Sequence, residues 1–218
     1  MRKSGESVME SMIDALREER YIFSLLKHIF LAEPPVEFLR EMGGIEAVPE
    51  EDDAGRGLNM LTGSVKRNIH QLDEFGEELA VEYARLFIGP KNPPAIPFAS
   101  FYLSESGSLM SDVTIDVRKR YLDAGMAVRA LYSTPDDHIG IEIEFLEYLT
   151  ERVVELLDRE EQEAASRFFG MREDFLKNHF SRWVPEFAEK IATATSSDFY
   201  RGAALMLKGW IGILAGEA

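Results

Sequence analysis

Three carboxylates and one imidazole lie close together in the sequence, at Asp136, Asp137, His138 and Glu142. Such groups bind metal ions and transfer protons, so the set could serve metal-dependent hydrolysis. His138 and Glu142 are four positions apart, which would place them on one face of a helix. Two ligands do not complete a metal site, however, and the sequence contains no His-Glu-x-x-His motif. The same carboxylates could instead pair with arginine side chains of a partner.

Other common catalytic sites have no support in the sequence. The chain contains no Cys, which excludes thiolate nucleophiles, disulfides and Cys-ligated metals. It contains no Gly-x-Ser-x-Gly motif of the kind that presents a nucleophilic serine. The run Gly55-Arg56-Gly57 follows no strand pattern and lacks the spacing of a phosphate loop. We therefore expect no enzymatic activity and no resident cofactor.

The composition is that of an acidic globular protein. The chain has 218 residues, of which 45% are hydrophobic, and a formal net charge of −15. This charge argues against nucleic-acid binding, which needs clustered Lys and Arg, and suits either solubility or a basic partner. The N-terminus lacks the apolar run of a signal peptide, and the longest apolar stretch, 203–215, is too short to span a bilayer. We expect a cytoplasmic chain without stable membrane insertion.

Helical periodicity covers most of the chain, and no convincing strand pattern appears. We predict an all-α fold, a single compact domain over 1–218 with about ten helices. Residues 43–57 are acidic and rich in glycine, so we predict a flexible loop there. Residues 126–132 are ambiguous between helix and linker. The helices are predicted at 7–31, 36–42, 58–70, 72–87, 111–124, 134–157, 159–177, 179–191 and 198–214.

The helix over 134–157 is predicted to be the central element. Thr134 is placed as its N-cap and Pro135 as its first helical residue. Its apolar side is so broad that the helix must be covered on more than one side. Gly140 costs about 1 kcal/mol relative to Ala inside a helix, which indicates that another segment approaches closely there. The carboxylates from Glu142 to Glu155 are predicted at solvated or rim positions.

A proline-rich segment, residues 88–102, interrupts the helical pattern. Its four prolines exclude a helix over most of its length. The segment also carries the aromatic residues Phe98, Phe101 and Tyr102. These side chains could pin the loop to the core, or they could form a binding surface, since long loops are often functional.

Three ordered motifs in this chain resemble the TorD/DmsD family, which is related to NarJ. The motifs are Glu-Tyr-Ala-Arg-Leu-Phe-Ile-Gly-Pro at 82–90, Pro-Phe-Ala-Ser-Phe-Tyr at 97–102 and Pro-Asp-Asp-His-Ile-Gly-Ile-Glu at 135–142. Segments 175–187 and 198–200 are also similar, so the resemblance spans roughly 60–214. Members of this family are cytoplasmic maturation chaperones of molybdenum-containing redox enzymes.

The resemblance implies a function and a binding surface. Such chaperones bind the twin-arginine signal peptide of the apo-form of a molybdoenzyme catalytic subunit and hold back export until the cofactor is inserted. Contact with GTP or with the molybdenum cofactor is implied by resemblance only, and the protein would be a monomer or homodimer. Aromatic residues would cover the apolar part of the peptide, and carboxylates would pair with its guanidinium groups. The predicted site comprises Tyr83, Phe87, Phe98, Tyr102, Pro135, Asp136, Asp137, His138 and Glu142.

Two alternatives remain open at this point. One is a metal-dependent helical hydrolase that uses Asp137, His138 and Glu142. The other is a helical adaptor that recognises no signal peptide. Bound metal would distinguish the first alternative from a chaperone, and affinity for Arg-Arg peptides would distinguish the second.

Overall fold

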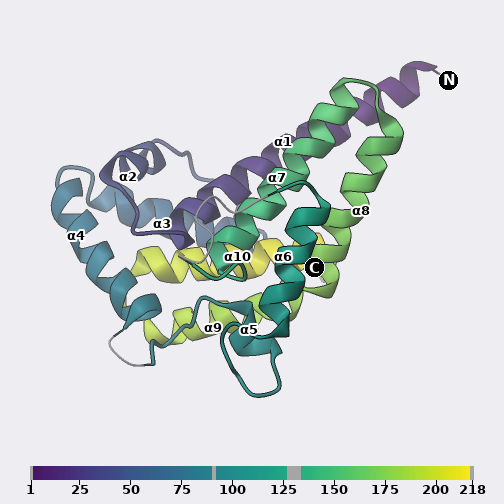
Figure 1. The fold of residues 1–218 in the computed structure, drawn as a ribbon. Helices are drawn as coiled ribbons and strands as arrows, with labels where there is room; N and C mark the ends of the chain where they lie inside the picture. The colour runs from purple at the N-terminus through teal and green to yellow at the C-terminus, as the bar shows by residue number, and fades with distance from the viewer. Residues whose placement is uncertain (1, 90–91, 127–133, 217–218) are drawn as a thin grey trace.

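The computed structural model describes residues 2–89, 92–126 and 134–216, with side chains from residue 9 onward (Figure 1). These residues form ten α-helices, one π-helical turn and one 3-10 turn, and they contain no strand. The predicted all-α fold class is therefore confirmed. The helices are α1 (Arg2–Phe30), α2 (Val36–Gly43), α3 (Asp53–Arg67), α4 (Leu72–Tyr83), α5 (Ala99–Leu103), α6 (Asp112–Asp123), α7 (Ile139–Asp158), α8 (Gln162–Asn178), α9 (Val184–Ala194) and α10 (Asp198–Ala215). The π turn η1 is Ala84–Ile88 and the 3-10 turn η2 is Phe180–Arg182.

Helix α7 lies at the centre of the packing. It runs between α1 and α8, and the three helices form an elongated arm that ends near the N-terminus (Figure 1). Its buried side chains include Ile143, Phe145, Leu146 and Leu149, none more than 1% exposed. Burial of each such side chain stabilises the fold by about 1.5–3 kcal/mol. The prediction that this helix is covered on more than one side is confirmed.

A buried ion pair joins the three helices of the arm. Arg172 of α8 donates from Nε to Oε1 of Glu19 on α1, at 2.8 Å. Thr150 of α7 donates its hydroxyl to the same oxygen, at 3.2 Å. Burial raises the pKa of Glu19, and the positive charge of Arg172 opposes that rise. Removing one partner would leave the other buried without a counter-charge, so loss of either Glu19 or Arg172 should destabilise the fold.

The start of α7 differs from the prediction. The helix begins at Ile139 rather than near Thr134, and its N-cap is His138, whose Nδ1 accepts a hydrogen bond from the Gly140 amide at 3.1 Å. The preceding residues form a turn, because a backbone carbonyl there makes a hydrogen bond to another segment instead of one within a helix. The Asp137 carbonyl accepts a hydrogen bond from the Ala99 amide, at 2.9 Å.

One loop prediction also needs correction. The predicted loop over 43–57 is shorter, because Asp52 caps α3 by accepting a hydrogen bond from the Gly55 amide at 2.8 Å. Gly57 therefore lies within α3, where α10 packs so closely that an added Cβ would stand 2.2 Å from the Met206 nitrogen. The prediction that the prolines exclude a helix over most of 88–102 agrees with the structure: among the described residues of this segment, the short helix α5 begins only at Ala99, two positions after the last proline, Pro97. A helix can start there because the prolines precede it and remove none of its hydrogen bonds.

The prediction of an ambiguous segment at 126–132 falls almost entirely outside the described residues. Within the described part of the chain, no helix is both long enough and apolar enough to cross a bilayer.

Candidate functional site

An open hollow of about 660 Å³ lies where four segments distant in sequence meet. The segments are the connector after α1, the end of α4 with its π turn, the proline-rich loop and the turn before α7. Two large apolar side chains that line it are well exposed, Leu31 at 41% and Ile88 at 62%. The lining residues are Leu31, Ala32, Glu33, Tyr83, Phe87, Ile88, Pro97, Phe98, Thr134 and His138.

The aromatic wall of the hollow comes from α4 and the π turn. Tyr83 donates its hydroxyl to the Phe30 carbonyl at 3.1 Å, and its ring meets that of Phe87 edge-on at 4.9 Å. Burial raises the pKa of Tyr83 to about 12, so the phenol keeps its proton at neutral pH. The π turn ends with the Gly89 amide donating to the Ala84 carbonyl at 2.7 Å. The π turn thus forms the C-terminal end of α4, with Gly89 as its cap.

The opposite wall is formed where the proline-rich loop pairs with the turn before α7. Phe98 and His138 make an isolated antiparallel bridge, with the Ile139 amide donating to the Pro97 carbonyl at 2.9 Å. The rings of Phe98 and His138 meet edge-on, with centroids 5.3 Å apart. A side-chain contact also joins the two segments, which are far apart in sequence. Oδ2 of Asp137 accepts a hydrogen bond from the amide of Ser100, 37 positions earlier, at 2.8 Å.

His138 is held in one neutral tautomer. Because Nδ1 accepts the hydrogen bond from Gly140, the ring proton belongs on Nε2. Burial lowers the pKa of His138 to about 4, while the neighbouring Asp137 opposes this change. At neutral pH the ring therefore adds no positive charge to the hollow.

This shift predicts a pH dependence of stability. The unfolded state binds a proton to His138 below about pH 6.5, whereas the folded state does so only near pH 4. Stability should therefore fall as the pH drops from about 6.5 to 4, by up to about 3 kcal/mol. Urea melts over this range check the prediction. His138→Asn keeps a cap acceptor without the titrating ring, so an equally steep loss in that variant would contradict it.

The two aspartates of the turn are buried and serve the fold. Asp136 is 3% exposed and accepts a hydrogen bond from Nε of Arg118 on α6, at 2.6 Å. Its carbonyl accepts one from the Tyr121 hydroxyl at 2.9 Å. Asp137 is 0% exposed, and its Oδ1 has no hydrogen-bond partner among the described residues. Pro135, which begins this turn, accepts at its carbonyl a hydrogen bond from the His138 amide at 3.1 Å.

Glu142 corrects the prediction that the carboxylates of this helix are solvated. It is fully buried, with Oε1 at 2.7 Å from Nε2 of His179 and Oε2 accepting a hydrogen bond from Nε1 of Trp183 at 3.1 Å. Burial raises the pKa of Glu142, and the nearby His179 opposes that rise. Because α7 is covered on several sides, this position faces the interior, where a carboxylate requires such partners.

The structure brings together four of the nine residues predicted for the site. Tyr83, Phe87, Phe98 and His138 line the hollow. Tyr102 does not line the hollow; its ring is stacked on Trp183, with centroids 5.4 Å apart. Pro135, Asp136, Asp137 and Glu142 do not line the hollow. The predicted pairing of Asp136, Asp137 and Glu142 with an incoming guanidinium is not supported, because these carboxylates are buried.

Sequence reasoning missed the carboxylate that does line the hollow, Glu33. It is exposed and lies in the connector between α1 and α2. The only sequence signal for this connector is Pro34-Pro35, which ends α1 next to an acidic residue. Leu31 and Ile88 were also missed, since nothing local indicates that an apolar side chain at a helix end stays exposed.

The arrangement does not favour the hydrolase alternative. Both oxygens of Glu142 are occupied by His179 and Trp183, and Nδ1 of His138 is occupied by a backbone amide. Within the described ranges, no three His, Asp or Glu side chains are grouped as metal ligands.

Comparison with known proteins agrees with the sequence resemblance. A family model described as nitrate reductase delta subunit matches residues 52–189. The TorD chaperone of Vibrio parahaemolyticus is 33% identical over 171 residues, which cover 78% of this chain and 74% of that protein. The TorD chaperone of Aliivibrio fischeri is 27% identical over 220 residues, covering 94% and 99%. The Haemophilus influenzae protein named "Probable Tat proofreading chaperone DmsD" is 28% identical over 146 residues, covering 67% and 62%.

A solved structure agrees at the level of the fold. A chain from Archaeoglobus fulgidus, assigned as a redox enzyme maturation protein, superposes with a TM-score of 0.52 at 23% identity and covers 87% of this chain and 91% of its own. The predicted resemblance is thus confirmed by the family match and by the curated relatives. The chain belongs to the nitrate reductase delta subunit family, the family of the TorD and DmsD chaperones.

Proposed function

We infer that this protein is a maturation chaperone for a redox enzyme. Membership of the family supports the inference, because the relatives that match most of the chain are named as chaperones. The hollow supports it from the structure, since it offers an open, partly apolar surface rather than a closed catalytic pocket. An adaptor without a peptide ligand would not need exposed Leu31 and Ile88 beside an aromatic wall.

We further propose that the hollow binds the twin-arginine signal peptide of a molybdenum-containing client in the cytoplasm. Such a peptide presents guanidinium groups followed by an apolar segment. The exposed side chains of Leu31 and Ile88, with Phe87 and Phe98 behind them, suit the apolar segment. Holding the signal peptide there would delay export until the client has received its cofactor.

Glu33 is the observation that carries this proposal. It is the carboxylate among the residues that line the hollow, and it is exposed to an incoming ligand. Neutral His138 on the other wall does not repel a cation. We propose that Glu33 accepts the guanidinium contact that the sequence had suggested for the buried carboxylates of the turn and of α7.

Glu33→Gln should therefore weaken binding of an Arg-Arg signal peptide by up to about tenfold, the effect of losing a partly solvated ion pair. Isothermal titration at low salt measures this change, and the wild-type affinity should itself fall as salt rises. Replacing both peptide arginines by lysine should also weaken binding, because Lys lacks the planar two-pronged donor.

Glu37→Gln is the matched control, because Glu37 is also exposed and lies only four residues away, in the first turn of α2. It removes the same charge without touching the hollow, so peptide affinity should change little. Equal weakening in the two variants would reduce the role of Glu33 to general electrostatic attraction. A wild-type protein with no preference for Arg-Arg peptides would overturn the proposed ligand.

A further inference from the structure

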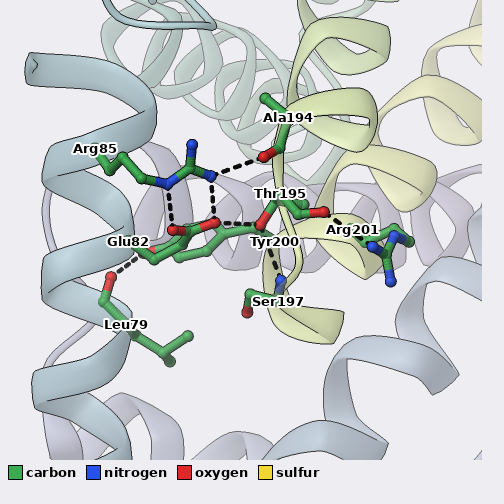
Figure 2. Close-up of polar contacts among 8 residues, drawn as sticks. All are labelled: Leu79, Glu82, Arg85, Ala194, Thr195, Ser197, Tyr200 and Arg201. Carbon is green, nitrogen blue, oxygen red and sulfur yellow. Dashed lines mark hydrogen bonds and ion pairs between the residues drawn. The ribbon is translucent and has the colours of Figure 1, made fainter.

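A cluster of polar contacts joins the end of α4 to the turn between α9 and α10 (Figure 2). Arg85 donates from Nε and Nη2 to the two carboxylate oxygens of Glu82, each at 2.7 Å. Nη2 of Arg85 also donates to the Ala194 carbonyl at 2.9 Å. The Thr195 hydroxyl donates to Oε1 of Glu82 at 2.5 Å. We call Glu82, Arg85 and Thr195 the clamp.

The partners of the clamp are themselves held in place. The Thr195 hydroxyl accepts a hydrogen bond from the Ser197 amide at 3.1 Å, and the Thr195 carbonyl accepts one from Nη2 of Arg201 at 2.9 Å. The side chain of Glu82 is 16% exposed, and the hydrogen bond from Arg85 lowers its pKa. The clamp therefore consists of an ionised carboxylate with directed donors on two sides, bound to a turn that two further hydrogen bonds hold.

The clamp acts on the same stretch of chain that forms the aromatic wall of the hollow. Glu82 directly precedes Tyr83, and Arg85 lies inside the π turn that ends with Phe87 and Ile88. The Leu86 carbonyl, also in this turn, accepts a hydrogen bond from the Ala95 amide of the proline-rich loop at 3.1 Å. A π turn is rare compared with α-helix, and these hydrogen bonds reach it from outside α4.

We propose that Glu82, Arg85 and Thr195 are positioning residues for ligand binding. They hold the π turn in place and thereby position Phe87 and Ile88. The three residues of the clamp do not line the hollow themselves. This inference rests on the proposed function of the hollow and adds to it a second group of residues on which affinity depends.

The competing explanation is that the clamp merely ties α4 to α10. Another contact makes that tie independently, because the Tyr200 hydroxyl donates to the Leu79 carbonyl at 3.0 Å (Figure 2). Tyr200→Phe removes this hydrogen bond, keeps the ring that packs against Phe87, and leaves the clamp untouched. It therefore serves as a structural control for loss of stability alone.

The test compares Thr195→Val with Thr195→Ser, and adds Arg85→Lys. Valine keeps the shape of Thr195 but has no hydroxyl, whereas serine keeps the hydroxyl; Lys cannot bridge both oxygens of Glu82. Thr195→Val and Arg85→Lys should weaken binding of an Arg-Arg signal peptide by roughly five- to tenfold. Thr195→Ser and Tyr200→Phe should stay within about twofold of the wild type. Amide hydrogen exchange at 84–89 should become faster in Thr195→Val and Arg85→Lys only.

Two results would overturn the proposal. One is unchanged affinity and unchanged exchange at 84–89 in Thr195→Val and Arg85→Lys. The other is an affinity loss that follows stability across all four variants, Tyr200→Phe included. If the wild type binds no Arg-Arg peptide, the proposed function fails by itself. The exchange measurement then tests the clamp separately. Faster exchange at 84–89 in Thr195→Val and Arg85→Lys alone supports the positioning role, and equal exchange in all four variants rejects it.

Discussion

Glu142→Ala should lower the free energy of unfolding by about 3–5 kcal/mol, the cost of breaking a buried pair by removing one partner. The variant leaves Nε2 of His179 and Nε1 of Trp183 facing an empty space in the core, because Glu142 contacts them at 2.7 and 3.1 Å. Neither group can reach water, since His179 is 4% exposed and Trp183 is 0% exposed. Denaturant melts by circular dichroism measure the loss.

Two further variants identify its cause. Glu142→Gln keeps the shape and an acceptor oxygen, so it should cost less, about 1–2 kcal/mol. Glu144→Ala removes a half-buried carboxylate from the same helix and should change stability by no more than about 0.5 kcal/mol. If Glu142→Ala cost no more than Glu144→Ala, the pair would have no structural importance.

Gly140→Ala should destabilise the protein by about 1–3 kcal/mol, although alanine is normally the better helix former. An added Cβ would stand 2.6 Å from Cα and 2.9 Å from the amide nitrogen of Leu31. Backbone atoms cannot swing aside as a flexible side chain can, so α7 and the connector after α1 must separate. Because Leu31 lines the hollow, peptide affinity should fall as well.

Gly170→Ala is the matched control for this prediction. Gly170 lies inside α8, and an added Cβ would meet nothing within 4 Å. That variant should become more stable by about 0.5–1 kcal/mol, the ordinary gain of Ala over Gly in a helix. Thermal or urea unfolding of both variants gives the comparison. Stabilisation in both would show that the contact with Leu31 relaxes without cost.

Much of the fold could be predicted because helix formation is largely local. Periodicity located nearly all the longer helices, and the cost of Gly140 indicated a close approach that the backbone of Leu31 makes. The motifs of the family resemblance located four residues of the hollow, including Phe98 and His138. These signals lie within short stretches of chain, so no knowledge of distant contacts was needed.

The remaining features depend on contacts between distant segments. Helix α7 starts at Ile139 because the Asp137 carbonyl pairs with the Ala99 amide. Glu142 resembles the other carboxylates of α7 in sequence, and only the packing of His179 and Trp183 makes it a core residue. Glu33 gains its place in the hollow when the connector after α1 meets the loop that carries Phe98. By itself the sequence determined most of the longer helices and the family. The tertiary structure decided which carboxylates are buried and which one lines the hollow, because burial depends on neighbours that come from elsewhere in the chain.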